Sequence, residues 1–534
     1  MPSSTPVDRT ALPAPAEPPS GSGGRRANPW LTLIAVAIGL FMVNLDGSVV
    51  SIANPEIGRD LHASTSDLQW VTNAYLLAMA AALILGGKLG DRFGRRTVYL
   101  VGVAGFVLSS VMIGLIGSVA GVIAFRALQG LFGALLIPNT LGLLRAVFPP
   151  RQFGTAVGLW AMVASCSTAL GPIVGGLLVE HVSWESVFYI NVPIGIGALV
   201  FSLLVLPQSK DSTGQHRFDL VGVAVLALGL VALVFGVIKG ESWGWSSPGT
   251  LGTLAGGLLL LALFARHEMR IAHPLLPMRL FRSPALTIGT VVTAINFFVL
   301  LGVIFFLMLY LQNVRGLGPV EVGVRTLPMS LASVVAAPLG AALTGRFGAR
   351  LTMPAGMLLE AVAALWMSTW DSHSAYGAMW PPFVLIGLGV GMVMSASSDA
   401  IVANAPVRDG GVASGLQATA LQIGGALGTS VLVSLVSGRV GATLLRELTG
   451  AGVPEPAAQG FAAAKDAVAM GVAPVDATVP AQLRAAVVEG SGDAFMNGVH
   501  AAVLVTAVLC VIGALLAAAG LRHGTRKPTA AAHA

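Results

Sequence analysis

Three ionisable residues stand inside long apolar runs of this sequence, where a charge is costly. Asp46 lies near the end of the first run, Arg126 lies in the fourth, and Glu360 lies near the middle of the eleventh. Residues of this kind at membrane depth carry protons, bind ions or pair with one another. The three side chains are therefore the first candidates for chemistry in this chain.

Asp46 and Arg126 are placed to meet. If successive apolar runs cross a membrane in alternating directions, both residues lie a few positions inside its outer face. An ion pair at that depth would release or admit a proton when the acid exchanges its partner during a conformational change. A purely structural buried ion pair is the alternative interpretation.

Glu360 has no obvious charged neighbour in the sequence. Three interpretations stay open for it: a second protonation or cation-binding site, an ion pair across a cavity with Arg325, or a carboxyl group that only faces a wet cavity.

Membrane-spanning helices must position these residues. The chain has 534 residues, of which 55% are hydrophobic and only 10% are charged, and its mean hydropathy is +0.82. Repeated apolar runs of about 20 residues must be helices in a bilayer, so an all-α polytopic membrane protein is predicted. The fourteen predicted spans lie at 30–51, 68–87, 97–117, 120–145, 153–179, 187–206, 219–238, 250–265, 284–311, 320–344, 351–370, 379–403, 411–437 and 499–521.

A charged block between the second and third runs, Leu83–Arg96, returns later as Leu339–Arg350. Aligned without a gap, Leu85–Arg96 and Leu339–Arg350 share the spacing of glycine, arginine and phenylalanine, so the chain is predicted to be internally duplicated. Parallel repeats of this kind are a known transporter architecture with the substrate near the midplane. Gly345 stands where Asp91 stands in the first block, which makes the two blocks unequal.

The duplication divides the chain into two six-helix halves around an inserted pair of helices. Most of the Lys and Arg residues fall into segments on one side, which predicts that both termini are cytoplasmic. Two short amphipathic helices or a solvated loop are the alternatives for the external segment. The predicted regions are a disordered cytoplasmic tail 1–29, an N-terminal half 30–206, inserted helices 219–265, a C-terminal half 284–521 with an external loop 438–498, and a cytoplasmic tail 522–534.

Three motifs point to one family. Gly87–Arg96, the segment around Asp46 and the Gly-Pro sequence at Gly171 resemble signatures of the major facilitator superfamily, and within it the fourteen-helix drug:proton antiporters (the QacA/EmrB-like branch). The resemblance covers most of 30–521. It departs from the family pattern at Glu185 and Ser186, and at the end of the Asp46 motif.

The resemblance implies roles for these motifs. Asp46 and Arg126 would couple transport to protons, with Glu360 as a further candidate for this role. A conformational switch would consist of Gly87, Asp91, Arg92, Gly94, Arg95 and Arg96. A helix kink typical of antiporters would consist of Gly171, Pro172, Gly175 and Gly176. A simple positive-inside anchor and a generic proline kink are the alternatives.

A cavity for unlike hydrophobic molecules needs apolar and aromatic walls with few polar groups. The candidates in the predicted spans are Trp70, Tyr75, Trp160, Asn296, Phe297, Phe298, Gln417 and Gln422.

The predicted function is proton-coupled export of hydrophobic or amphiphilic drugs or antibiotics across a bacterial cytoplasmic membrane. Alternatives are an importer, an exporter of an endogenous metabolite or lipid, and a non-transporting sensor or partner subunit on the same fold. No phosphate loop or clustered catalytic group is present in the sequence, so we expect no enzyme activity, cofactor or metal. The net charge of +6 lies in short loops, which disfavours nucleic acid binding. The protein is expected to act as a monomer.

Overall fold

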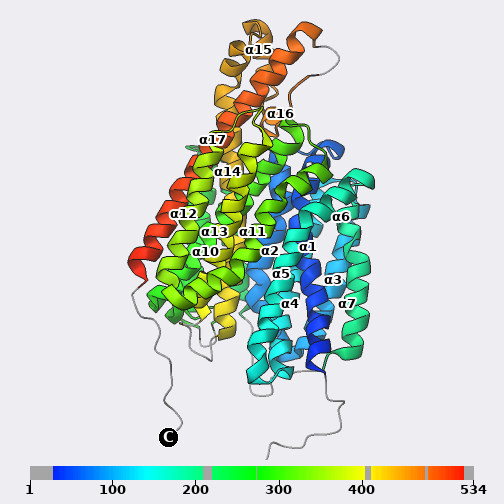
Figure 1. Cartoon of the computed structure of the whole chain (residues 1–534), viewed down its shortest axis with the longest axis vertical. Coiled ribbons are helices and arrows are strands. Elements are labelled where there is room, and N and C mark those ends of the chain that lie inside the picture. Colours follow the sequence, from blue (N-terminus) through cyan, green and yellow to red (C-terminus); the bar gives the residue numbers. More distant parts are fainter. Residues whose placement is uncertain are drawn as a thin grey trace, which may run out of the picture.

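The computed structural model describes residues 28–207, 219–271, 274–402, 404, 410–475 and 479–521. Within these ranges the chain forms helices and no strand. Long helices run side by side along the long axis of the molecule, with the described ends of the chain, near Pro29 and Gly520, at the same end (Figure 1). The predicted tails 1–29 and 522–534 lie almost wholly outside the described residues.

In the N-terminal half, the second helix begins and ends at clear capping residues. Ser64 and Asp67 form a capping box at the start of the second helix. Gly94 ends that helix with a φ of +98°, which glycine adopts without strain. The helices are α1 (Pro29–Asp60), α2 (Thr65–Phe93), α3 (Arg95–Leu115), α4 (Val119–Val147), α5 (Pro150–His181), α6 (Ser186–Tyr189) and α7 (Asn191–Val205).

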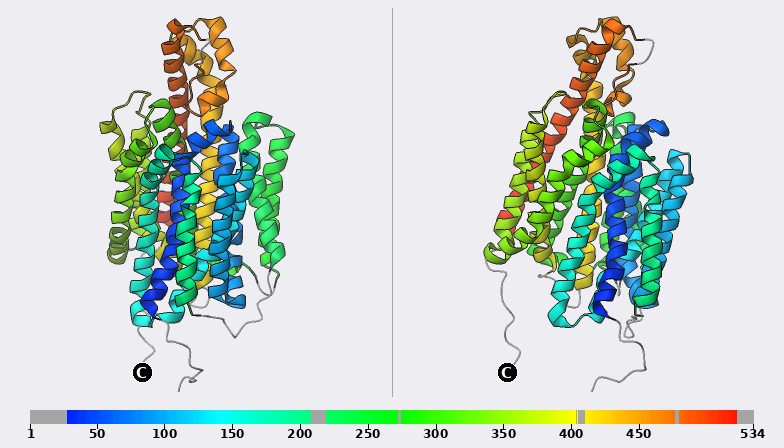
Figure 2. Two further views of the ribbon diagram at one scale, coloured as in Figure 1. Left: turned by 90° about the vertical axis from the view of Figure 1, so that its right-hand side faces the viewer. Right: turned by 45° about the vertical axis from the view of Figure 1, so that its right-hand side comes forward.

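Two inserted helices, α8 (Leu220–Trp243) and α9 (Pro248–Glu268), pack on each other at the side of the bundle. In Figure 2 they form a separate pair beside the other helices in the left view. α8 contacts α2 of the first half and α14 of the second half. The inserted pair therefore touches both halves.

The C-terminal half repeats the design of the first. Gly348 has a φ of +82° and separates its second and third helices, as Gly94 does in the first half. The elements are η1 (Met278–Arg282), α10 (Pro284–Leu309), which continues as the π-helix η2 (Tyr310–Val314), α11 (Pro319–Phe347), α12 (Ala349–Met367), α13 (Tyr376–Val402), α14 (Gly410–Gly450), α15 (Glu455–Ala462), α16 (Lys465–Ala469) and α17 (Ala481–Gly520).

Thirteen of the described helical segments are long and apolar enough to cross a membrane. α12, which carries both Arg350 and Glu360, lies against α13 and α17 in the same bundle. Together they account for the fourteen predicted spans, so the all-α fold is confirmed.

The segment predicted as an external loop, 438–498, is mostly helical. α14 continues to Gly450 and α17 begins at Ala481, so both helices project beyond the bundle and α15 and α16 fill the space beside them (Figure 1). Val440, Leu444 and Leu448 are buried in this projection. The solvated loop is therefore the wrong alternative, and short helices are present. Residues 476–478 lie outside the described part.

The two halves meet through α5 with α11 and α2 with α14. At the end of the bundle away from the chain termini, this contact is close. A Cβ added at Gly176 would lie 2.5 Å from the carbonyl oxygen of Pro319, and one at Gly323 would lie 2.3 Å from that of Pro172. Glu180 also accepts a hydrogen bond from the N–H of Val320 at 2.8 Å. The halves are sealed against each other at this end.

Candidate functional site

The carboxylate of Asp46 lies at the centre of a buried hydrogen-bond network. Arg126 Nη1 donates to Asp46 Oδ2 at 2.7 Å. Gln129 Nε2 and Asn191 Nδ2 donate to Asp46 Oδ1 at 2.9 Å and 2.7 Å. The side chains of Asp46 and Arg126 are 0% and 2% exposed. The predicted ion pair between Asp46 and Arg126 is therefore present, and the charge on Asp46 is balanced.

Arg126 is held on all sides. Its Nε donates to the carbonyl of Val71 at 3.2 Å, and Nη1 also donates to Gln129 Oε1 at 2.6 Å. The guanidinium group lies 4.1 Å from the centre of the Tyr75 ring, a cation–π contact. Tyr75, a candidate for the cavity wall, is therefore buried as a cover of Arg126.

Sequence reasoning assigned no role to Gln129, Asn191 and Ser110. Ser110 Oγ accepts from Gln129 Nε2 at 2.8 Å and from Asn191 Nδ2 at 3.2 Å. Both amides were visible as polar residues within apolar runs, and Gln129 stands three positions after Arg126, on the same helix face. Those two signals could have found them.

Glu360 lies in the core of the second half. Asn296 Nδ2 donates to its Oε1 at 2.5 Å, and Cys510 Sγ lies 3.9 Å from Oε2. Glu360 is 0% exposed, so it does not face a wet cavity. In the described chain no cationic group pairs with it, and an unpaired carboxylate would be very costly there. This environment favours the neutral acid.

The pairing of Glu360 with Arg325, one of the three interpretations left open, is not present in this structure. Arg325 forms an ion pair with Glu321, one turn earlier on α11, and lies over the ring of Tyr376 at 5.3 Å. An i,i+4 pair on one helix needs no long-range approach, which explains why the nearer acid is preferred.

The two buried carboxyl groups occupy related places. Asp46 is surrounded by the first, third, fourth and sixth membrane helices of its half, namely α1, α3, α4 and α7. Glu360 lies on α12 between α10, α13 and α17, which are the corresponding helices of the second half. Only the first carboxyl group has a cationic partner in the described chain.

The glycine and arginine block, Gly87–Arg96, connects α3 to α4 and α7 at the end of the bundle where the chain termini lie. Arg95 Nη1 donates to the carbonyl of Gly142 on α4 at 2.9 Å, and Arg96 Nη2 donates to that of Leu203 on α7 at 2.7 Å. Arg92 lies over the ring of Phe93. Gly94 makes the turn, and a Cβ added at Gly87 would lie 3.6 Å from Pro138. The side chain of Asp91 lies outside what the structure describes.

The Gly-Pro motif of α5 packs against both halves. Cβ atoms added at Gly171 and Gly175 would lie 1.9 Å from Ser48 Oγ and 3.2 Å from the carbonyl of Val49, both on α1. Gly176 and Pro172 instead face α11 across the seam. The motif therefore lets α5 approach two helices at once.

The remaining cavity candidates are mostly engaged with neighbours. Gln417 Nε2 donates to Ser398 Oγ at 2.7 Å, and Trp160 Nε1 donates to Thr140 Oγ1 at 2.9 Å. Gln422 Nε2 lies 2.9 Å from Met79 Sδ across the two halves. Trp70 lies beside Phe235 of α8. Phe297 and Phe298 are half-buried on α10. The contacts do not gather these residues into one pocket.

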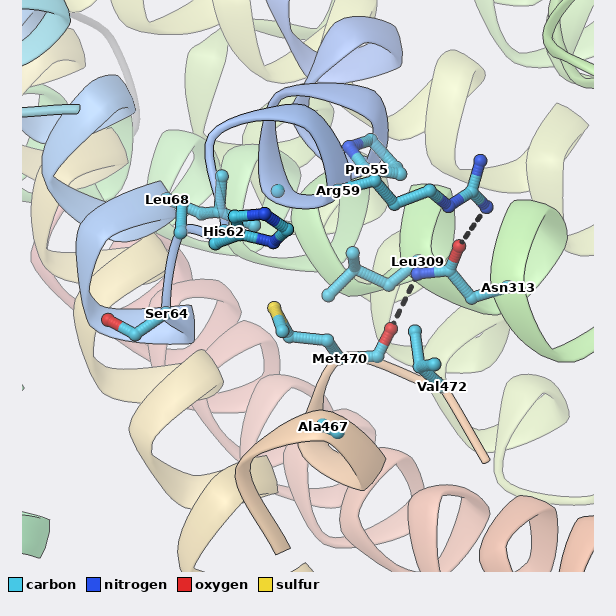
Figure 3. A pocket seen from close by; sticks show the side chains of 12 residues that line it. Pro55, Arg59, His62, Ser64, Leu68, Leu309, Asn313, Ala467, Met470 and Val472 are labelled. Carbon is cyan, nitrogen blue, oxygen red and sulfur yellow. Dashed lines mark hydrogen bonds between the residues drawn. The ribbon is translucent and has the colours of Figure 1, made fainter. Parts of the chain in front are cut away.

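A cavity of about 360 Å³ lies instead at the sealed end of the bundle, under the projection (Figure 3). Arg59, His62 and Leu68 line it from the first half, and Leu309 and Met470 line it from the second. Asn313 bridges the two sides: it accepts from Arg59 Nη2 at 2.8 Å and donates to the carbonyl of Met470 at 2.7 Å.

Comparison with known protein families identifies the family to which this helical bundle belongs. The family model described as Major Facilitator Superfamily matches residues 36–429. The chain belongs to the Major Facilitator Superfamily. The resemblance expected from the motifs is confirmed, and this superfamily member is a multi-pass membrane protein of a transporter family.

Relatives of this superfamily member match nearly its whole length. It is 46% identical over 499 residues to the tetracenomycin C resistance and export protein of Streptomyces glaucescens, covering 93% of this chain and 92% of the relative. It is 32% identical over 501 residues to the multidrug efflux pump LfrA of Mycolicibacterium smegmatis, covering 92% and 96% of the two chains.

Among solved structures, the superfamily member resembles the inward-facing, unoccupied crystal structure of a bacterial homologue of the human lysosomal transporter Spinster. The TM-score is 0.62 at 16% identity, and 92% and 96% of the two chains are covered. This likeness shows the shared fold.

Proposed function

We propose that this chain is a proton-coupled antiporter that exports hydrophobic or amphiphilic drugs or antibiotics across a bacterial cytoplasmic membrane. The observation that carries the proposal is the match over nearly the whole of both chains to a resistance and export protein. Other relatives named for drug efflux and for puromycin and methylenomycin A resistance support it.

Proton coupling would centre on Asp46. In the present conformation Arg126, Gln129 and Asn191 stabilise its charged form. A conformational change that withdraws Arg126 would leave a buried carboxylate without its counter-ion, and uptake of a proton would then restore neutrality. Binding and loss of the proton would thus follow the movement of α4 relative to α1.

Glu360 would provide a second protonation site. Its only hydrogen-bonding partners in the described structure are an amide and a thiol, so it would hold its proton in this conformation. Since Asp46 is paired and Glu360 is not, the two carboxyl groups would carry protons in different conformations of the cycle.

The glycine and arginine block would act as the switch. With the opposite end sealed by α5 and α11, the described conformation would open toward the end that carries the block, which we propose faces the cytoplasm together with both termini. Bonds from Arg95 to α4 and from Arg96 to α7 hold the first half together during rocking. The working unit would be a monomer in the lipid bilayer, with protons and the exported compound as its small-molecule partners.

The test is transport in inverted membrane vesicles with a fluorescent drug, under an imposed pH gradient. Wild-type vesicles should accumulate the drug, and accumulation should stop when the pH gradient is collapsed. A deletion strain should become more susceptible to the same drug. Export of an endogenous product is the alternative: a strain whose susceptibility is unchanged across a drug panel, but which retains its own metabolite, would favour it.

A further inference from the structure

Two carboxyl groups meet at the terminus-bearing end of the inserted helices, away from both sites described above. Asp219 caps the start of α8, and Glu268 is the last residue of α9. Asp219 is 4% exposed and Glu268 is 2% exposed. Their carboxyl groups approach one another over Gly222. Two like charges at this distance in a buried place would repel strongly.

Each carboxyl group has one oxygen occupied by ordinary donors. Asp219 Oδ1 accepts from the N–H of Gly222 at 2.8 Å and lies 2.9 Å from His267 Nε2. Glu268 Oε2 accepts from the N–H of Leu276 at 2.8 Å. These bonds fix the orientation of both carboxyl groups.

The other two oxygens lie near each other. Asp219 Oδ2 and Glu268 Oε1 are buried and receive no donor from any described group. A Cβ added at Gly222 would lie 2.2 Å from the first and 2.9 Å from the second, so both oxygens lie over the same glycine. Two acceptors cannot bond without a hydrogen between them, and a proton on one of them supplies it.

The surrounding charges account for one of the two carboxyl groups. Lys88 of α2 is near enough to interact electrostatically with both acids, but its Nζ donates to the carbonyl of Pro274 at 2.8 Å and forms no ion pair with either in the described chain. His267, on α9 itself, is partly exposed. His267 contacts Asp219 and Lys88 is bound to Pro274, so Glu268 has no ion-pair partner of its own in the described chain, which favours a proton on Glu268.

The proton belongs to Glu268. Burial raises the pKa of Asp219, but the N–H of Gly222 and the neighbouring His267 outweigh burial, so the pKa of Asp219 lies below its ordinary value. Asp219 is therefore the acceptor, and Glu268 supplies the O–H.

We propose that Asp219 and Glu268 form a proton-binding site in which one proton, shared between Asp219 Oδ2 and Glu268 Oε1, fastens the inserted helices to each other and to α2. The fastening runs through the chain after α9: Glu268 accepts from the N–H of Leu276, while Lys88, in the charged block Leu83–Arg96, donates to the carbonyl of Pro274. Release breaks the O–H bond of Glu268, leaves its electron pair on the carboxylate and passes the proton to water. The added negative charge then draws Lys88 away from Pro274.

Infrared difference spectroscopy of the purified, lipid-reconstituted full-length protein tests the site without using any cargo. Raising the pH from acidic to alkaline should remove a protonated-carboxyl band. Glu268→Gln should lack that band, because its amide donates to Asp219 permanently, and Asp219→Asn should shift it. Asp46→Asn and the exposed Asp399→Asn should keep it. An unchanged band in both Glu268→Gln and Asp219→Asn overturns the proposal.

Thermal unfolding across the same pH range gives a second readout. Wild type should lose melting temperature as the proton leaves at alkaline pH, and Glu268→Gln should lose less. Equal losses overturn the fastening role. The measurements are repeated with sodium replaced by a large organic cation. If the band or the melting temperature changes with sodium concentration at constant pH, the site binds a metal ion, and the proposal of a bound proton is overturned. Neither the infrared band nor the melting temperature depends on transport, so both measurements test this site even if the proposed transport function is wrong.

Discussion

Arg126 Nη1 lies 2.7 Å from Asp46 Oδ2, and both side chains are buried between α1 and α4. Removing one partner of a buried ion pair leaves the other charge uncompensated, which typically costs about 3–5 kcal/mol. Under the proposed function, the same contact must break and re-form in each cycle. Stability and transport therefore depend on the same pair in different ways.

Asp46→Asn should abolish drug accumulation driven by a pH gradient. The amide cannot take up and release a proton, although it keeps the size of the side chain. The measurement is uptake into inverted vesicles, normalised to folded protein in the membrane. The exposed Asp399→Asn is the matched control and should transport normally. Unchanged accumulation in Asp46→Asn would remove Asp46 from the coupling mechanism.

The double variant Asp46→Asn/Arg126→Gln should be more stable than the sum of the two single losses predicts. Each single variant leaves one unpaired partner, whereas the double variant leaves none. Coupled residues in contact show interaction energies of about 0.5–3 kcal/mol. Thermal unfolding of wild type, the two single variants and the double variant in detergent gives this double-mutant cycle. Simple additivity would show that the contact contributes nothing.

Gly90→Ala should disrupt the packing of α2 on α4. The added Cβ would lie 1.6 Å from Asn139 Oδ1, which belongs to the side chain whose Nδ2 donates to the carbonyl of Gly86 at 3.0 Å. Overpacking of this kind costs about 1–3 kcal/mol. Gly87→Ala, three residues earlier, is the control, because its Cβ would lie 3.6 Å from Pro138. Equal melting temperatures for the two variants contradict the prediction.

Gly176→Ala should loosen the seal between α5 and α11. Its Cβ would lie 2.5 Å from the carbonyl oxygen of Pro319, a backbone atom that cannot move alone. Labelling of a single cysteine placed at Gly318 should become faster than in the parent protein. Gly197→Ala, where the added Cβ meets nothing within 4 Å, should not change the labelling rate. A slower rate in Gly176→Ala would mean that the seal tightens.

Glu360→Gln should remain folded while changing the dependence of transport on pH. Glutamine keeps the contact with Asn296 and stays neutral, as the buried acid does. If Glu360 carries a proton in the cycle, fewer protons would move per drug molecule. The check is the drug gradient reached at a fixed pH gradient in proteoliposomes, with the exposed Asp399→Asn as control. The same gradient in wild type and variant would leave Glu360 with a structural role.

Hydropathy was enough to predict the all-α fold, because the bilayer requires long apolar helices, and the repeat of the charged block predicted the inserted pair between two halves. The contact of Asp46 with Arg126 followed from depth alone. Gln129 and Asn191 were harder to assign, since neutral amides in spans carry no charge signal. The role of Glu360 stayed open between three interpretations, because the sequence alone does not show that Arg325 pairs with the nearer Glu321.

The ends of α14 and α17 could not be predicted from hydropathy. Both helices continue beyond the predicted spans through sequence that carries charged residues such as Arg446 and Glu489, and these charges end an apolar run without ending a helix. What stabilises the extensions is their packing on each other and on α15 and α16, which a single sequence does not reveal.

The helical projection lies at one end only, so binding of a probe to it would show which face of the membrane that end occupies. It is held by α14 and α17, which are continuous with the bundle, so a nanobody that recognises α15 would bind a fixed surface at one face only. With the termini in the cytoplasm, such a nanobody would stain intact cells after removal of the cell wall. With the opposite orientation, it would stain only inverted vesicles.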